Sequence, residues 1–149
     1  MIVASQVHAS ITDSLVRGAR DVLRQAGAVA GNIRVVWVPG AFELPVVAAR
    51  VAESRPSPSA IIAVGAIIRG QTPQYEVLAH AVAQGLTQVA INAMVPVTFG
   101  VIVATSWAQA KARSGGAMGN RGAEATKAAL AVLHLFETID GTNSRSPHA

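Results

Sequence analysis

Apolar residues occur along the chain in two alternating patterns, short continuous runs and longer stretches in which they recur every three or four positions. Continuous runs are typical of buried strands, and the spaced pattern is typical of amphipathic helices. The continuous runs predict strands at 2–5, 33–38, 60–67, 89–91 and 97–103. The spaced stretches predict helices at 15–26, 44–52, 74–87, 106–113 and 122–137, with Thr12 or Asp13 capping the first.

This alternation of strands and helices predicts one domain over residues 1–140, with a single parallel sheet and helices on both of its faces. Residues 141–149 are polar and are expected to form a disordered tail. In sheets of this kind, ligands bind beyond the carboxyl ends of the strands. Function is therefore expected in four loops, which are 5–10, 39–43, 67–74 and 104–106.

Composition narrows the class of protein further. Hydrophobic residues make up 51% of the 149 residues and charged residues only 13%, so we expect other subunits to cover part of the apolar surface. The net charge is +4, but the arginines are scattered rather than clustered, which argues against a nucleic-acid partner. Because there is no cysteine, no long apolar run and no signal-peptide pattern, the sequence predicts a cytoplasmic protein without a membrane span.

Three loops carry residues suited to chemistry. Segment 69–73 (RGQTP) follows a buried strand and opens a helix, where exposed amide N–H groups can bind an anion, although it could also be an ordinary turn. Phe42 could stack on a ring or pack in the core, and its spacing favours the core. Glu43 could hydrogen-bond a polyol or complement the helix dipole. Arg113, just before a glycine-rich turn, is a candidate anion clamp.

Several segments, taken in their order along the chain, resemble the lumazine synthase family of riboflavin biosynthesis. They are 38–45 (VPGAFELP), 65–73 (GAIIRGQTP), 95–101 (VPVTFGV), Gln109 and Ala110 with Arg113, and 119–125 (GNRGAEA). The resemblance implies a flavodoxin-like, three-layer α/β/α sandwich that assembles as a homopentamer and, in many members, as a sixty-subunit icosahedral shell. It also implies condensation of 5-amino-6-(D-ribitylamino)uracil with 3,4-dihydroxy-2-butanone 4-phosphate, with no metal or organic cofactor.

The resemblance further assigns roles to individual positions. Residues that would hold the pyrimidine substrate are Val7, Ala41, Phe42, Glu43, Ala66, Ile67, Ile68 and, from a neighbouring subunit, Phe99. Residues that would bind the phosphate are Gly70, Gln71, Thr72 and, from across the subunit boundary, the catalytic Arg113. Gln74 occupies the position of the family's proton-transfer histidine.

Two positions depart from the family pattern where they would touch the substrates. Gln74 can donate a hydrogen bond but cannot titrate near neutral pH, and Val7 replaces an aromatic that usually stacks on the pyrimidine. The main hypothesis is therefore a lumazine synthase with reduced or altered activity. The alternatives are a shell-forming scaffold that has lost catalysis and an archaeal-type riboflavin synthase, which shares the subunit fold. Segments 119–125 and 70–73 favour the lumazine synthase branch over the last alternative.

Overall fold

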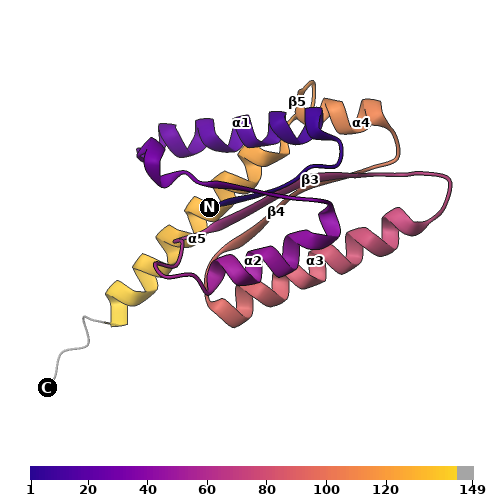
Figure 1. The fold of residues 1–149 in the computed structure, drawn as a ribbon. Helices are drawn as coiled ribbons and strands as arrows, with labels where there is room; N and C mark the ends of the chain where they lie inside the picture. The colour runs from indigo at the N-terminus through magenta and orange to yellow at the C-terminus, as the bar shows by residue number, and fades with distance from the viewer. Residues whose placement is uncertain (144–149) are drawn as a thin grey trace, which may run out of the picture.

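Four parallel strands form the central sheet of the computed structural model, which describes residues 1–143 (Figure 1). The strands are β1 (Ile2–Ser5), β2 (Val35–Val38), β3 (Ile61–Ile68) and β4 (Val97–Ala104), and their order across the sheet is β2-β1-β3-β4. All three neighbouring pairs are parallel, so the carboxyl ends of the strands lie at one edge. The predicted parallel sheet is confirmed, with β2 and β4 as its edge strands.

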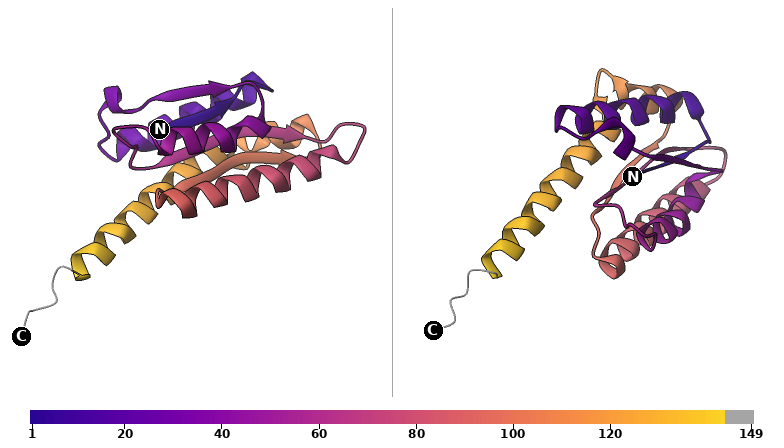
Figure 2. Two further views of the ribbon diagram at one scale, coloured as in Figure 1. Left: turned by 60° about the horizontal axis from the view of Figure 1, so that its bottom comes forward. Right: turned by 60° about the vertical axis from the view of Figure 1, so that its left-hand side comes forward.

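Helices cover both faces of this sheet, as predicted. Helices α1 (Ala9–Gln25) and α5 (Arg121–Asn143) lie on one face, and α2 (Leu44–Ala52) and α3 (Gln74–Ala93) lie on the other (Figures 1 and 2). Within the described residues, no helix is long and apolar enough to cross a membrane.

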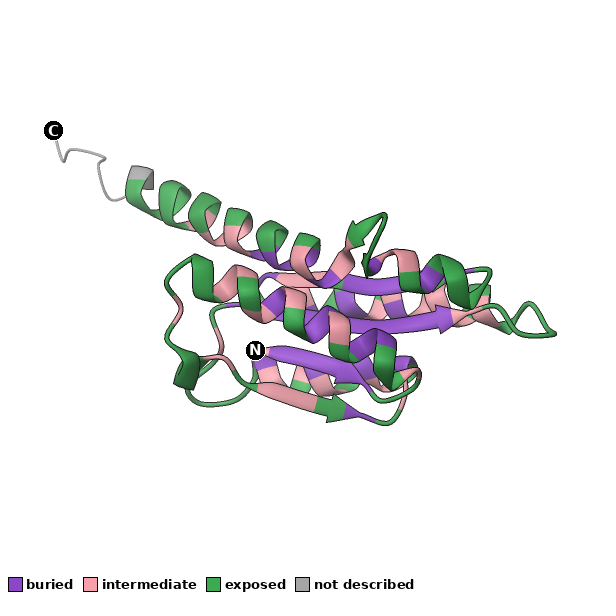
Figure 3. Cartoon of the chain, turned by 90° about the horizontal axis from the view of Figure 1, so that it is seen from above, coloured by how far each residue is buried: buried purple, intermediate pink, exposed green. Residues whose placement is uncertain are grey.

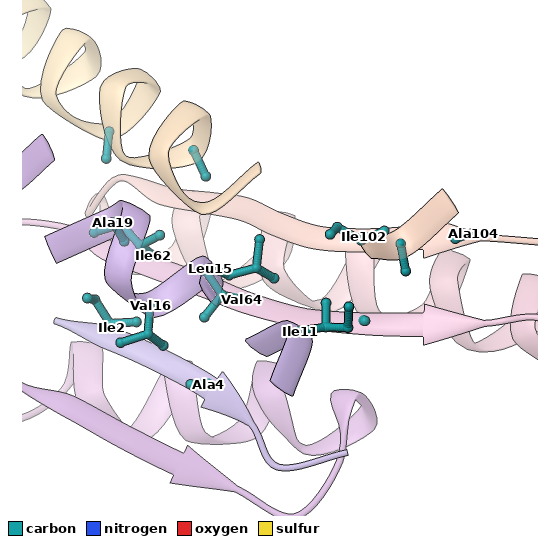
Figure 4. Close-up of a cluster of buried hydrophobic side chains, with 14 of the residues drawn as sticks. Ile2, Ala4, Ile11, Leu15, Val16, Ala19, Ile62, Val64, Ile102 and Ala104 are labelled. Carbon is teal, nitrogen blue, oxygen red and sulfur yellow. The ribbon is translucent and has the colours of Figure 1, made fainter. Parts of the chain in front are cut away.

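Strand β3 supplies side chains to both hydrophobic cores because successive residues of a strand point to opposite faces. Ile62 and Val64 pack against Leu15 of α1 on one face, within the cluster shown in Figure 4. Ile61 and Ala63 belong to the second cluster, beneath α2 and α3. A fully buried Ile or Leu contributes roughly 1.5–3 kcal/mol, so this double burial fixes the register of β3.

The first helix begins earlier than the sequence predicts. Its N-cap is His8, whose backbone is left-handed at φ 58° and ψ 50°. The His8 carbonyl accepts hydrogen bonds from the N–H groups of Ile11 and Thr12, and the Thr12 hydroxyl donates to the Val7 carbonyl at 3.5 Å. Thr12 is thus buried inside the helix, and the predicted cap at Thr12 or Asp13 is wrong.

The predicted strand at 89–91 is also wrong, because helix α3 continues through these residues to Ala93. Val82, Leu86 and Val89 are buried at helical spacing against the sheet. A short apolar run is compatible with a strand or with a buried turn of helix. Residues 89–91 are helical because Val89 continues the face of α3 that packs on the sheet.

Several smaller elements and boundaries differ from the prediction. Two short 3₁₀ helices, η1 (Ala30–Asn32) and η2 (Ala41–Glu43), flank β2, which is shorter than the predicted strand at 33–38. Helix α4 (Trp107–Ala112) leads into an unpredicted hairpin of β5 (Ser114–Gly116) and β6 (Gly119–Asn120). Helix α5 runs to Asn143, so 141–143 are helical rather than part of a tail, and 144–149 lie outside the described residues.

The far end of α5 extends past the body of the domain and is largely exposed (Figures 2 and 3). Its first turns, by contrast, pack directly on α1. The side-chain amide of Asn120 donates to the Ser14 carbonyl of α1 at 2.9 Å, and its oxygen accepts from the Ala123 N–H at 3.0 Å. A side chain on Gly122 would overlap the backbone of Leu15. The segment around Asn120 therefore sets the contact between the two helices.

Gly122→Ala should destabilise the domain by about 1–3 kcal/mol, because the added methyl group would push α5 away from Leu15. Urea unfolding measures the effect. Gly141→Ala in the same helix is the matched control, since its added methyl group would meet no atom within 4 Å, and a change within about 0.5 kcal/mol is expected. Equal stability of the two variants would show that α1 and α5 can separate near Gly122 at little cost in the free energy of unfolding.

Candidate functional site

The loops after β1, β2 and β3 surround one pocket at the carboxyl edge of the sheet, which we call the strand-end pocket. Its volume is about 350 Å³, near the lower end of the range for small-molecule sites. The residues that line it are Val7, His8, Gly40, Ala41, Phe42, Glu43, Ala66, Ile67, Ile68, Gly70, Thr72, Gln74, Tyr75 and Leu78. Three of the four loops predicted to carry function therefore meet here.

The loop after β2 presents an aromatic ring and a carboxylate to this pocket. The Glu43 N–H donates to the Gly40 carbonyl at 3.3 Å, which closes the short helix η2. Ala41 is buried under the loop, whereas Phe42 is 64% exposed, so the core position that spacing favours for Phe42 is wrong. A side chain on Gly40 would meet the Glu43 carboxylate at 2.9 Å, so this glycine leaves room for the carboxylate beside the loop.

The end of β3 forms an apolar floor. Ala66 and Ile67 are buried and Ile68 is half-buried, and all three line the pocket. Beyond them, the Arg69 N–H donates to the Ala104 carbonyl of the next strand at 2.8 Å. This hydrogen bond keeps the chain paired with β4 as far as Arg69, and the loop from Gly70 onward is exposed (Figure 3).

The start of α3 has the features of an anion site. Its N-cap is Pro73, and no side chain caps the helix, which leaves amide N–H groups at the positive end of the helix dipole. Gly70 and Thr72 line the strand-end pocket beside this end, while Gln71 is exposed and is not among the lining residues. All seven residues that this subunit is predicted to contribute to the pyrimidine site line the strand-end pocket, namely Val7, Ala41, Phe42, Glu43, Ala66, Ile67 and Ile68.

Helix α3 also brings Gln74 and Tyr75 to the pocket. The Tyr75 hydroxyl donates to Glu76 Oε1 at 3.0 Å, and this hydrogen bond raises the pKa of the phenol above its usual value. Tyr75 is therefore protonated at neutral pH. His80, one and a half turns further along the helix, is exposed and does not line the pocket.

Arg113 and Phe99 lie elsewhere in this chain. Arg113 borders a second hollow of about 350 Å³, which we call the arginine pocket; it is lined by Val101, Ile102, Val103, Gln109, Arg113 and Arg121. The Arg121 guanidinium pairs with Glu124 at 2.9 Å, whereas among the described residues that of Arg113 has no ion-pair partner. Phe99 is 37% exposed on the same edge strand, β4. The two pockets share no lining residue.

Four residues of the strand-end pocket, His8, Gly40, Tyr75 and Leu78, are not among the predicted site residues. Leu78 follows Gln74 by four positions and so lies on the same helix face, a spacing that could have indicated it. His8 follows Val7 in a predicted loop, where its ring could partly replace the missing aromatic or simply lie in solvent, whereas no pattern distinguishes Gly40 from its neighbours. Across residues 1–143, no group of three or more His, Asp or Glu side chains is placed to hold a metal ion.

Several known proteins are similar in sequence to this chain. The profile of the family described as 6,7-dimethyl-8-ribityllumazine synthase matches residues 1–137. A relative with that name from Gemmatimonas aurantiaca is 45% identical over 137 residues, covering 92% of this chain and 83% of the relative. A second, from Coxiella burnetii (strain RSA 493 / Nine Mile phase I), is 40% identical over 142 residues, covering 95% and 93%. A third, from Leuconostoc mesenteroides, is 38% identical over 138 residues, covering 93% and 88%.

Phe42→Ala should leave the free energy of unfolding within about 0.5 kcal/mol of the wild-type value, because the ring is exposed. Leu44→Ala, two positions along and fully buried, is the comparison and should cost about 2–5 kcal/mol. Chemical denaturation followed by circular dichroism measures both values. A large loss for Phe42→Ala would place the ring in the core after all and remove it from the pocket wall.

Proposed function

The chain belongs to the 6,7-dimethyl-8-ribityllumazine synthase family, and we propose that it condenses 5-amino-6-(D-ribitylamino)uracil with 3,4-dihydroxy-2-butanone 4-phosphate. It is an enzyme of the transferase class acting in riboflavin biosynthesis. The observation that carries the substrate assignment is the strand-end pocket, where an apolar floor, an exposed aromatic ring, a carboxylate and an uncapped helix start meet.

These features suit the two substrates. Phe42 offers a ring face to the pyrimidine, the Glu43 carboxylate can accept hydrogen bonds from ribityl hydroxyls, and the start of α3 can hold the phosphate. In the reaction two C–N bonds form, each with loss of water, and phosphate leaves with the electron pair of its C–O bond. Holding both substrates side by side accelerates such steps strongly, since effective molarities reach about 10⁵–10⁸ M.

Gln74 distinguishes this chain from the family pattern at the pocket. An amide cannot accept and release protons near neutral pH, and a positioned acid–base group typically contributes about 10²–10⁴-fold in rate. We therefore propose that the reaction proceeds here with reduced turnover, driven mainly by phosphate binding and proximity.

The complete site is proposed to form between subunits of a homopentamer, which can assemble further into a sixty-subunit shell. The strand-end pocket of one subunit would face the arginine pocket and Phe99 of the next. Support comes from the separation of the two pockets and from the position of the arginine pocket on the edge strand β4. Phe99 and Val103 are exposed on that strand, which is unfavourable in water and is relieved if another subunit covers them.

A second candidate function is assembly without catalysis. It is favoured by Gln74 and Val7, because both replace side chains on which the family reaction is expected to depend. The two candidates differ in whether lumazine forms above the uncatalysed rate.

The wild-type chain should form lumazine faster than the uncatalysed condensation, and Gln74→His should raise kcat by at least about tenfold by restoring a titratable group. Absorbance of the product with both substrates supplied measures the rate. Gln74→Asn is the matched control and should not raise it. Absence of wild-type turnover would leave assembly as the function, and an unchanged rate in Gln74→His would mean that another departure, such as Val7, limits the reaction.

Mixed oligomers test whether the site is shared between subunits. Arg113→Ala should raise the KM for the phosphorylated substrate roughly 10- to 100-fold. Thr72→Glu should also weaken binding of this substrate, because the added carboxylate repels the phosphate group. If each site takes one pocket from each of two neighbours, coassembly of the two variants leaves about one quarter of the sites intact, and a similar share of activity should return. If the mixture is no more active than the separate variants, both halves come from one chain.

A further inference from the structure

The strand-end pocket contains one imidazole, that of His8. Among the residues of 1–143 that line this pocket, it is the only histidine. Its backbone adopts the left-handed conformation that few side chains other than Gly, Asn, Asp and His occupy readily. Hydrogen bonds from the Ile11 and Thr12 N–H groups, at 2.9 and 3.2 Å, hold its carbonyl in place. The residue therefore has a fixed backbone at the pocket wall.

The ring of His8 is held as well. It meets Trp107 edge to face, with ring centroids 5.6 Å apart and planes at 66°. Trp107 is the first residue of α4, which lies beside the beginning of α1 (Figure 1). The start of α4 is itself braced, because the Gln109 N–H donates to Ser106 Oγ at 3.2 Å and Gln109 Oε1 accepts from the Thr105 N–H at 2.8 Å.

The two polar side chains that α3 brings to the pocket, Gln74 and Tyr75, do not exchange a proton near neutral pH. Gln74 carries an amide, which does not titrate, and Tyr75 a phenol whose pKa is raised by its hydrogen bond to Glu76. An imidazole ordinarily titrates close to neutrality. His8 is thus the pocket residue whose chemical type suits proton transfer at the pH of a cell.

We propose that His8 is a catalytic residue that carries protons in the condensation and that Trp107 is its positioning residue. This inference rests on the function proposed above. As the substrate amine adds to the ketone, the imidazole accepts one proton from the nitrogen and passes it to the ketone oxygen, which becomes the hydroxyl of a carbinolamine. As the C=N bond forms, the second proton of the nitrogen passes through the imidazole to this hydroxyl, which leaves as water. The imidazole is regenerated, and His8 performs part of the proton transfer that Gln74 cannot, within the reduced turnover proposed above.

The charges around His8 bear on its pH dependence. Glu43 and Tyr75 share the pocket with it, on η2 and α3. Lys111 is the charged residue of α4, and no acidic residue lies in the first turn of α1, a segment the structure describes in full. Glu43 is the acidic residue among these groups and Lys111 the basic one. Because only a neutral imidazole can accept a proton from the amine, the rate should rise with pH in a single step.

His8→Asn is the direct test, because Asn also tolerates the left-handed backbone. Its kcat should fall at least about tenfold and lose the step in its pH profile, whereas the exposed His80→Asn should keep the wild-type profile. The double variant that combines His8→Asn with Gln74→His should regain both the lost kcat and the step in the pH profile. An active wild type whose profile His8→Asn leaves unchanged would overturn the role of His8 alone. A wild type with no turnover would overturn the proposed function, and the role of His8 with it.

Trp107 provides a readout that does not require a folded His8 variant. In a Trp37→Phe background the remaining tryptophan is Trp107, and protonation of the adjacent imidazole should quench its fluorescence. The midpoint of this titration should coincide with the midpoint of the pH–rate profile of the same protein. A difference of more than about one pH unit would show that the rate depends on some other group.

Discussion

The fold depends on one constraint, the burial of β3 on both faces. A strand that is apolar on both sides is stable only if helices cover both sides, and short connections between parallel strands place those helices there. Parallel pairing then brings the carboxyl ends of β1, β2 and β3 to the same edge of the sheet. The strand-end pocket lies where the loops leaving this edge enter their helices, the loop after β1 turning to one face of the sheet and the loops after β2 and β3 to the other.

The main elements of the fold can be predicted from the sequence because hydrophobic burial decides them. Continuous apolar runs indicate β1, β3 and β4, and helical spacing indicates α2 and α5. The failures have equally physical reasons. The 89–91 segment has the composition of a strand, but its burial follows the period of α3, and the hairpin of β5 and β6 is too short and polar to show any hydrophobic pattern. The start of α1 depends on a left-handed His8, which no periodicity reveals.

The site is predictable to a different degree. The rule that ligands bind beyond the carboxyl ends of parallel strands selects, without reference to any relative, the three loops that line the strand-end pocket, together with 104–106, which does not line it. The exposure of Phe42 does not follow from spacing, because it depends on the short helix η2 turning Ala41 inward and the ring outward. Nor does spacing indicate that Arg113 belongs to a separate pocket. That separation comes from the position of β4 at the edge of the sheet, a property of strand order rather than of local sequence.

Helix α1 connects the wall of the strand-end pocket to the segment beside the arginine pocket. At its first residue it follows His8 in the wall of the strand-end pocket, and at Ser14 it accepts the hydrogen bond of Asn120, which precedes Arg121 of the arginine pocket. Ser14 follows His8 by six positions, a rise of roughly 9 Å along the helix. One residue inserted or deleted between them would rotate one end against the other by about 100°. The opening turns of α1 thus act as a spacer of fixed length, and natural variation there should proceed by substitution rather than by change of length.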